Sequence, residues 1–234
     1  MDILPKPDMR ACFHIRLSEC NMDFLPNLPT LLAFAATTLL LAATPGPDMT
    51  LSISRALAQG KKAALFVVLG TSLGIVVHTM LVAFGISALI TASPTAFLVL
   101  KTGGAAYLLW LAVQAIRFGS RLSIKKVEEV KATPLANISS GFWVNLLNPK
   151  VIIFFMTFLP QFVSAGDPAV THKLLFLGFC FILIGMPVNA AVVFAADWLA
   201  GWLQNNRKVL RGMDYTFAGV FSVFAAKILL TQAR

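Results

Sequence analysis

Charged residues are scarce in this chain of 234 residues: Asp, Glu, Lys and Arg make up only 12%, whereas 58% of the residues are hydrophobic. Soluble domains usually contain about 25% charged residues, so this composition excludes an ordinary soluble domain. Apolar stretches long enough to cross a bilayer as helices, about 20 residues each, recur along the sequence. The pattern predicts an all-α integral membrane protein, because a β-barrel would show short segments of alternating polarity instead.

Cysteine and histidine are also rare, with three of each. Cys12, Cys20 and Cys180 have no paired spacing, so no disulfide framework or metal cluster is indicated, and we expect no cofactor and no metal. A Walker motif is absent, so ATP-driven transport would need a partner subunit. A hydrolase built on Ser72 and His78 is disfavoured, because residues six apart on one helix point to different faces.

Positive charge exceeds negative charge, giving a formal net charge of +9. No basic stripe interleaved with aromatic residues is present, so the charge indicates membrane topology rather than nucleic-acid binding. By the positive-inside rule the connectors rich in Lys and Arg are cytoplasmic, which places both chain termini outside. These connectors contain Arg55, Lys61, Lys62, Arg117, Arg121, Lys125, Lys126, Lys131, Arg207, Lys208 and Arg211.

Residues 1–21 differ from the rest, because they carry Lys6, Arg10 and Arg16 but no apolar segment typical of a secretory signal. We predict that they are a disordered leader or result from a mis-assigned start, with Met22 as the natural first residue. Residues 22–234 are predicted to form a single transmembrane transporter domain. A basic connector at 118–135 divides this domain into halves of about 22–117 and 136–234.

Six transmembrane helices are expected, three in each half. They cover about residues 24–47, 63–91 and 97–116 in the first half, and 136–165, 174–196 and 209–230 in the second. An odd number of spans in each half requires the second half to be inverted relative to the first. Both first spans are interrupted by proline, at Thr44-Pro45-Gly46-Pro47-Asp48 and at Asn148-Pro149-Lys150. We therefore predict two inverted three-helix repeats with proline-broken first and fourth helices.

The two interruptions are costly at bilayer depth. A proline inside a helix costs about 3 kcal/mol, and an Asp or Lys in mid-membrane adds about 2.5–3.5 kcal/mol on insertion scales. Broken helices at corresponding positions of inverted repeats are typical of transporter binding sites. The interruptions therefore predict an ion or solute site, and a helix kink that serves packing alone is the alternative.

These segments resemble a known family. The TPGPD segment at 44–48, the NPK segment at 148–150 and the Gly-Gly-Ala-Ala-Tyr-Leu run at 103–108 resemble the LysE/RhtB amino-acid exporters, over about residues 22–234. The resemblance implies a six-helix, multi-pass protein of the bacterial inner membrane and no enzymatic activity. It also implies secondary active export of small amino acids such as homoserine, threonine, lysine or leucine, coupled to the proton gradient. Family members vary at the position of Asp48, so its acidity bears on substrate choice or coupling.

An amino acid needs an anion site for its carboxylate and an acceptor site for its ammonium. Helix N-termini carry partial positive charge and suit the carboxylate, and the half-helices following the two breaks supply such termini. Carbonyls freed by proline, together with Asp48, suit the ammonium. The candidate substrate- or ion-binding residues are therefore Thr44, Pro45, Gly46, Pro47, Asp48, Asn148, Pro149, Lys150 and Asn189.

Four of the polar side chains leave a choice between two roles. Asp48 and Lys150 follow prolines in corresponding halves, so we expect them to pair; otherwise Asp48 caps a helix and Lys150 snorkels to lipid phosphates. Asp48 and His78 are candidates for a proton relay, although His78 also suits a neutral histidine bonded to a neighbouring helix. Asn189, two residues after Pro187, either lines the pathway or bonds across helices.

Other function classes remain open at this level. An intramembrane enzyme is one, and a thiol-redox or ion carrier of similar architecture is another, although the spans contain only Cys180. A gated channel would show the same sequence pattern as an alternating-access carrier. The expected partners are a small amino acid and membrane lipid, without nucleic acid. A homodimer is a reasonable expectation for a small carrier, although no helix face requires one.

Overall fold

Proline and glycine mark the helix limits in the first half of the chain. The computed structural model describes residues 25–118, 132–164 and 167–232. Helix α2 (Leu28–Ala43) and helix α3 (Pro47–Gln59) are separated by the first predicted interruption. Gly60, at a φ of 88° that favours glycine, separates α3 from α4 (Lys61–Ala92), and α5 (Pro94–Phe118) follows.

The second half repeats the pattern of a broken helix followed by long ones. Helix α6 (Pro134–Leu146) ends at the second interruption, and α7 (Pro149–Ile153) begins directly after it. The chain continues through a π-helical turn (Phe154–Phe158) and a 3-10 turn (Leu159–Phe162). Helices α8 (Val170–Phe194), α9 (Ala196–Asn205) and α10 (Arg207–Gln232) complete the described part, which contains helices and no strands.

Three helices, α4, α5 and α8, are long and apolar enough to cross a membrane. Two further candidates are bent pairs: α2 with α3, bent by 51°, and α6 with the helical segment 149–162, bent by 52°. Up to five spans are therefore present among the described residues, and both predicted interruptions coincide with real helix breaks. The predicted sixth span coincides with α10, which is not among these candidates, so a count of six stays a prediction.

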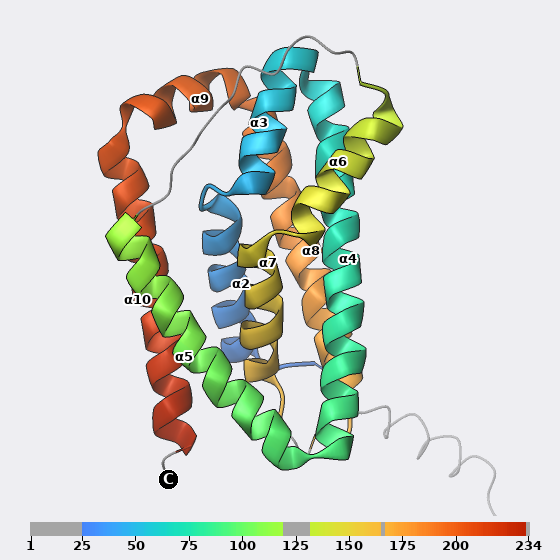
Figure 1. Cartoon of the computed structure of the whole chain (residues 1–234), viewed down its shortest axis with the longest axis vertical. Coiled ribbons are helices and arrows are strands. Elements are labelled where there is room, and N and C mark those ends of the chain that lie inside the picture. Colours follow the sequence, from blue (N-terminus) through green and yellow to red (C-terminus); the bar gives the residue numbers. More distant parts are fainter. Residues whose placement is uncertain (1–24, 119–131, 165–166, 233–234) are drawn as a thin grey trace, which may run out of the picture.

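Corresponding helices of the two halves run in opposite directions (Figure 1). In that view α2 and α3 rise while α6 and α7 descend, α4 descends while α8 rises, and α5 rises while α10 descends. Helix α4 packs against both α6 and α8, and α5 packs along α10. This arrangement brings the two broken helices together in the middle of the bundle.

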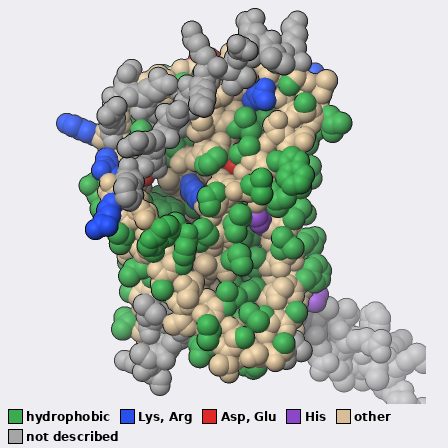
Figure 2. Space-filling model, in the orientation of Figure 1, with side chains coloured by type: hydrophobic (Ala, Val, Ile, Leu, Met, Phe, Trp, Pro, Cys, Tyr) green, Lys and Arg blue, Asp and Glu red, His purple; other side chains and the backbone are tan. Residues whose placement is uncertain are grey.

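Aromatic side chains fill the core below the two breaks. Phe154, Phe155 and Phe158 of the π-helical turn are fully buried, with Phe34 of α2 and Phe221 of α10 in the same cluster. The rings of Phe154 and Phe158 are in contact, with centroids 4.6 Å apart and planes tilted by 31°. The outer surface is apolar as well: Figure 2 shows hydrophobic side chains over the middle and lower parts of this face, with Lys and Arg gathered in its upper half. Such an exterior suits lipid contact.

Glycine allows α4 and α6 to approach each other closely. A Cβ on Gly70 of α4 would meet the carbonyl oxygen of Ile138, and a Cβ on Gly141 of α6 would meet the carbonyl oxygen of Val67. Gly74, one turn beyond Gly70, faces the side chain of Asn145. The spacing of Gly70 and Gly74 is that of a small-residue helix contact, and here it places Asn145 at the centre of the bundle.

Asp167 supports the start of α8 outside the spans. Its carboxylate accepts a hydrogen bond from the N–H of Ala169 at 2.9 Å and forms an ion pair with Lys173. Burial alone would raise the pKa of Asp167, but the hydrogen bonds from Lys173 and Ala169 and the positive charge of Lys173 together lower it.

This lowered pKa makes the contribution of Asp167 to stability depend on pH. The contribution is present above the pKa of the unfolded chain and is lost as the pH falls through the lower folded value. We expect Asp167→Asn to destabilise the protein by less than about 1 kcal/mol at pH 7. The measurement is the thermal midpoint of both proteins in detergent, and the gap between them should narrow progressively as the pH falls below about 4. A gap that stays constant at acidic pH would contradict this role.

Candidate functional site

The first helix break leaves backbone acceptors without their helical donors. Pro45 stands four residues after Leu41 and has no N–H, so the carbonyl of Leu41 cannot form its usual helical hydrogen bond. Lys150 replaces the missing donor: its ammonium donates to the carbonyls of Leu41 at 3.0 Å and of Thr44 at 2.8 Å. The ammonium also lies 5.8 Å from the ring centroid of Phe217. Lys150, from the second broken helix, thus satisfies the free carbonyls at the C-terminal end of α2 in the first.

Asp48 lies in the first turn of α3, where the helix dipole favours a carboxylate. Its two carboxylate oxygens accept hydrogen bonds from the side-chain amides of Asn145 at 2.7 Å and of Asn148 at 3.1 Å. Gly46 precedes the helix and has no side chain that could cap it. Asp48 is therefore held by α6 and by the cap of α7, which are both parts of the other broken helix.

The second break mirrors the first. Pro149 stands four residues after Asn145 and cannot donate to its carbonyl. That carbonyl accepts the N–H of Asn148 at 3.0 Å and lies 3.4 Å from Nε2 of His78 on α4. The side chain of Asn148 in turn accepts the N–H of Lys150 at 3.0 Å and caps α7. Each break is thus stabilised by a basic side chain from another element.

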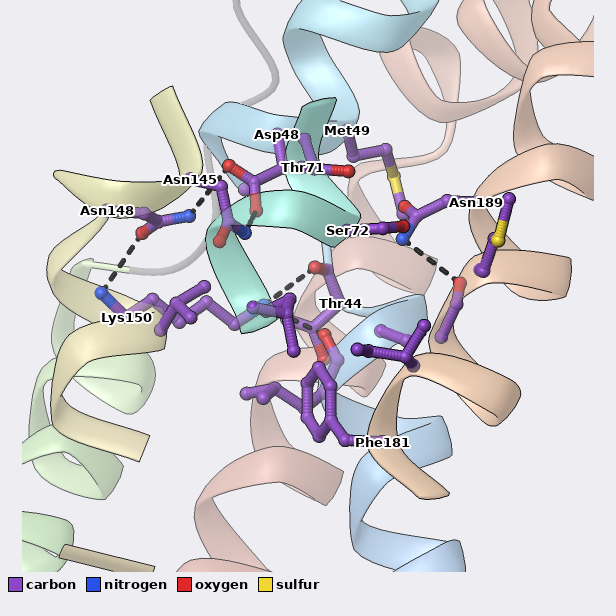
Figure 3. Close-up of a pocket in the computed structure, with 18 residues that line it drawn as sticks. Thr44, Asp48, Met49, Thr71, Ser72, Asn145, Asn148, Lys150, Phe181 and Asn189 are labelled. Carbon is purple, nitrogen blue, oxygen red and sulfur yellow. Dashed lines mark hydrogen bonds between the residues drawn. The ribbon is translucent and has the colours of Figure 1, made fainter. Parts of the chain in front are cut away.

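A polar cavity lies between the two breaks (Figure 3). Its volume of about 60 Å³ provides space for a few water molecules. Figure 3 shows Asp48, Asn145 and Asn148 together on one side, with Lys150 and Thr44 below them and Ser72 and Asn189 on the far side. The lining residues are Leu41, Ala42, Thr44, Gly46, Asp48, Met49, Thr71, Ser72, Ile75, Asn145, Asn148, Lys150, Val151, Phe181, Ile182, Gly185, Met186 and Asn189.

Most of the residues singled out from the sequence lie at this cavity. Thr44, Gly46, Asp48, Asn148, Lys150 and Asn189 line it. Pro45, Pro47 and Pro149 do not line it, and they contribute by breaking the helices. Gly46 has a φ of −152°, which any residue adopts, so it is not required for backbone conformation. A Cβ at Gly46 would lie 3.7 Å from Cδ of Lys150, an ordinary contact.

The expected direct pair between Asp48 and Lys150 is wrong. Within the described residues no ion pair joins them, since the one ion pair found there is between Lys173 and Asp167. The physical reason is that each charged group has nearer partners, amides for Asp48 and backbone carbonyls for Lys150. The carbonyls expected to receive a solute's ammonium are thus already used by the ammonium of Lys150.

His78 and Asn189 were each left with two roles by the sequence. His78 is buried on α4 and contacts the carbonyl of Asn145, as expected for a histidine bonded to a neighbouring helix. It does not line the central cavity but lies at a separate apolar groove with Leu81 and Met156. Asn189 lines the cavity and donates to the carbonyl of Gly185 within α8 at 3.1 Å, so this hydrogen bond is not made across helices.

Four residues of the site were missed from the sequence. Asn145 supplies a hydrogen bond to Asp48, and its position four residues before Pro149 was the signal that could have revealed it. Ser72 and Thr71 on α4 line the cavity, but hydroxyls in an apolar helix give little signal. Asp214, buried within α10, acts electrostatically on Lys150 and was visible as an acidic residue inside an expected span.

Comparison with known proteins gives consistent matches. The family model described as LysE type translocator matches residues 39–232. A homoserine/homoserine lactone efflux protein of Salmonella typhimurium is 28% identical over 86% of this chain and 96% of its own length. A cysteine/O-acetylserine efflux protein of Klebsiella pneumoniae is 34% identical over 58% of this chain and 66% of its own. A leucine efflux protein of Enterobacter sp. is 24% identical over 79% of this chain and 87% of its own. No solved structure is significantly similar.

Proposed function

Since this chain belongs to the LysE type translocators, we propose that it exports small amino acids through the cavity between its two broken helices. The family membership confirms the resemblance read from the sequence, and the protein is a translocator rather than an enzyme. The efflux of homoserine, of cysteine or O-acetylserine and of leucine by relatives supports an amino-acid solute here.

The observation that carries the proposal is that a carboxylate and an ammonium lie at one cavity without being bonded to each other. Asp48 and Lys150 both line it, and each is held by neutral partners. A zwitterion presents the complementary pair of charges. In the proposed bound state the solute's ammonium approaches Asp48, and its carboxylate approaches Lys150 and the N-terminus of α3. The small volume of the cavity favours a small amino acid.

We propose six membrane crossings arranged as two inverted repeats. The opposite directions of the paired helices in Figure 1 and the matching bends of 51° and 52° support this topology. In it α10 provides the sixth crossing, and the ends bearing Lys61, Lys62 and Arg117 lie in the cytoplasm. The expected localisation is the bacterial inner membrane, with both termini outside the cytoplasm. The leader at 1–21 and most of the 118–135 connector lie outside the described residues, and these assignments stay predictions, as does a homodimer.

Coupling to the proton gradient is part of the proposal. Asp48 is the carboxyl on the cavity wall and is therefore the first candidate for loading and releasing a proton. His78 lies on the other side of Asn145, whose side-chain amide bonds Asp48 and whose carbonyl contacts His78. The amide and carbonyl of Asn145 do not pass on protons, so exchange between Asp48 and His78 would need an intervening water; it would connect the cavity with the apolar groove beside α4. Its check is the pH dependence of transport in Asp48→Asn and His78→Gln.

Efflux from loaded cells tests the function itself. Cells lacking their own amino-acid exporters are loaded with dipeptides of homoserine, threonine, lysine, leucine or cysteine, and the amino acid appearing outside is followed over time. We expect at least one of the five to leave several times faster when the protein is present than when Asp48→Asn is present at equal abundance. If none of them leaves faster, the proposed solute class is wrong.

A further inference from the structure

A second polar region extends from the central cavity along α3. Asp48, Ser52, Arg55 and Gln59 follow one another at spacings of four, three and four residues, which places them on one face of the helix. Two hydrogen bonds show that this face meets α6: Asn145 donates to Asp48 at 2.7 Å, and Asn137 donates to Gln59 at 3.2 Å. We call the strip between these two bonds the α3–α6 seam; it contains Ser52, Arg55 and Asn137.

The seam holds buried polar atoms that are not satisfied by the described part of the protein. Oγ of Ser52, Nε of Arg55 and Oδ1 of Asn137 have no hydrogen-bond partner there. Ser52 and Asn137 are each only 1% exposed. An unsatisfied buried polar group costs about 1–3 kcal/mol. Three such groups on facing sides of two helices form an arrangement that a polar ligand would complete.

Packing of α3 does not require polar residues on this face. A neighbouring face, about 100° round the helix, is apolar, and there Met49 and Ile53 pack against Ala196 and Ala200 of α9. That contact buries the helix by ordinary hydrophobic packing. The polar residues of the seam therefore add cost rather than stability in the present arrangement, which points to a role in binding.

The chemistry of the seam suits a carboxylate. A guanidinium presents planar donors that match a carboxylate oxygen pair, and no ion pair occupies Arg55 among the described residues. The hydroxyl of Ser52 can donate to the same carboxylate, whereas the amide oxygen of Asn137 can only accept and therefore suits the ammonium of the same solute. Arg55 does not line the central cavity, and seven helical residues separate it from Asp48 by about 10 Å along the axis. The seam is thus a separate site from the cavity.

We propose that the α3–α6 seam is a second binding site, which takes the carboxylate of an amino acid moving between the central cavity and the Lys61–Lys62 end of the bundle. This inference rests on the proposed export function and adds the path by which the solute reaches the cavity. Arg55 and Ser52 bind the carboxylate, and Asn137 accepts a hydrogen bond from the ammonium of the same solute. The solute then moves along the polar face of α3 to Asp48.

The kinetic test separates this site from the central one. In efflux of L-homoserine, or of whichever amino acid the loading assay identifies, we expect Arg55→Gln to raise KM about tenfold or more, the equivalent of one lost charge-assisted contact. Equilibrium binding of the same amino acid to detergent-purified protein should change less than about twofold, because the cavity is intact. Lys62→Gln, which removes an exposed basic charge near the same end, is the matched control and should leave both quantities unchanged.

Two results, one kinetic and one from equilibrium binding, would overturn the proposal. An unchanged KM in Arg55→Gln would show that no carboxylate is recognised there. A loss of equilibrium binding as large as in Asp48→Asn would assign Arg55 to the central site or to its support. Arg55→Lys keeps the charge and should recover part of the loss, whereas a purely structural role would leave it as impaired as Arg55→Gln.

A labelling test addresses the path without relying on transport. Ser52→Cys is made in a chain whose Cys12, Cys20 and Cys180 are replaced by alanine, and inside-out vesicles are treated with a membrane-impermeant maleimide. We expect slow labelling that the transported amino acid retards, with Ile53→Cys on the apolar face unlabelled. Labelling of neither residue before denaturation would reject the path. Labelling of Ser52→Cys in a protein that transports no amino acid would support a polar path along α3 but reject an amino acid as its solute.

Discussion

Asp48→Asn is expected to lower the protein-dependent part of amino-acid efflux, after subtraction of leakage from cells without the protein, about 100-fold. This is the scale for removing one partner of a buried charge pair, here the proposed pair between Asp48 and the solute's ammonium. The substitution keeps the size of the side chain but replaces one acceptor oxygen by a donor. Asn145 and Asn148 both donate to the carboxylate of Asp48, so an amide at this position opposes at least one of them. The variant also removes the negative charge that is proposed to receive the solute's ammonium.

Lys150→Met should reduce efflux to a similar extent for the complementary reason. Methionine retains most of the aliphatic length but leaves the carbonyls of Leu41 and Thr44 without the donor that now satisfies them. It also removes the cation that is proposed to receive the solute's carboxylate. If one solute bridges the two charged groups, the effects of the two substitutions on efflux are not additive. The double variant Asp48→Asn/Lys150→Met should then have an efflux rate only slightly lower than that of either single variant.

Exposed residues of the same charge provide the controls for both variants. Asp197→Asn on α9 and Lys62→Met at the start of α4 alter surface charge alone, and each should change the efflux rate less than about twofold. Rates are normalised to the amount of monodisperse protein recovered from the membrane. Wild-type efflux in Asp48→Asn or in Lys150→Met would remove that residue from the mechanism, and the charge-complementarity argument would fail with it.

Gly141→Ala is expected to destabilise the protein strongly. The new methyl group would collide with the carbonyl oxygen of Val67, a backbone atom that cannot move aside without shifting α4. Overpacking of this kind costs about 3 kcal/mol at the upper end of the usual range, which lowers the thermal midpoint by about 6–12 °C in a protein of this size. Gly70→Ala should behave alike, because its Cβ would meet the carbonyl oxygen of Ile138.

The same helix offers a matched control. Gly85 also lies in α4, but nothing stands within 4 Å of the position its Cβ would take. Gly85→Ala should leave the midpoint unchanged or raise it slightly, because alanine favours helix by about 1 kcal/mol over glycine. Thermal unfolding of the three variants in one detergent makes the comparison. Equal midpoints for Gly141→Ala and Gly85→Ala would show that α4 and α6 do not meet closely.

Separation of α4 from α6 should also affect transport. Gly70 and Gly74 of α4 and Gly141 of α6 keep the two helices close together, and Asn145 of α6 donates its hydrogen bond to Asp48 from this position. Residual Gly141→Ala protein that folds is therefore expected to bind amino acid more weakly than Gly85→Ala protein. This consequence links the packing of two helices to the geometry of the cavity.

Local chemistry made several features readable from the sequence. Proline lacks an N–H, so the breaks after Ala43 and after Leu146 follow from Pro45, Pro47 and Pro149 whatever the surroundings. Long apolar runs required membrane helices, and α4, α5 and α8 lie where the composition placed them. Six of the nine candidate binding residues line the cavity. Five of them, all except Asn189, lie at a helix break, where polar groups can be tolerated.

Pairing between distant residues was beyond sequence reasoning. Lys150 was assigned to Asp48 because both follow prolines, yet its flexible side chain reaches the carbonyls of Leu41 and Thr44 instead. Asn145 could not be recognised as a partner of Asp48 until the close approach of α4 and α6 had set its position. The unsatisfied atoms of Ser52, Arg55 and Asn137 likewise become visible only when α3 and α6 face each other.

The sequence by itself determined that this protein is a bundle of membrane helices with two of them broken, because hydropathy and the missing N–H of proline act within a few residues of the chain. The tertiary structure alone decided which groups satisfy the broken ends and that Asp48 and Lys150 remain unbonded across one cavity. The reason is that hydrogen bonds between helices depend on the distances between those helices. Glycine contacts and the crossing geometry set these distances, and the spacing of the polar residues along the chain encodes neither of them.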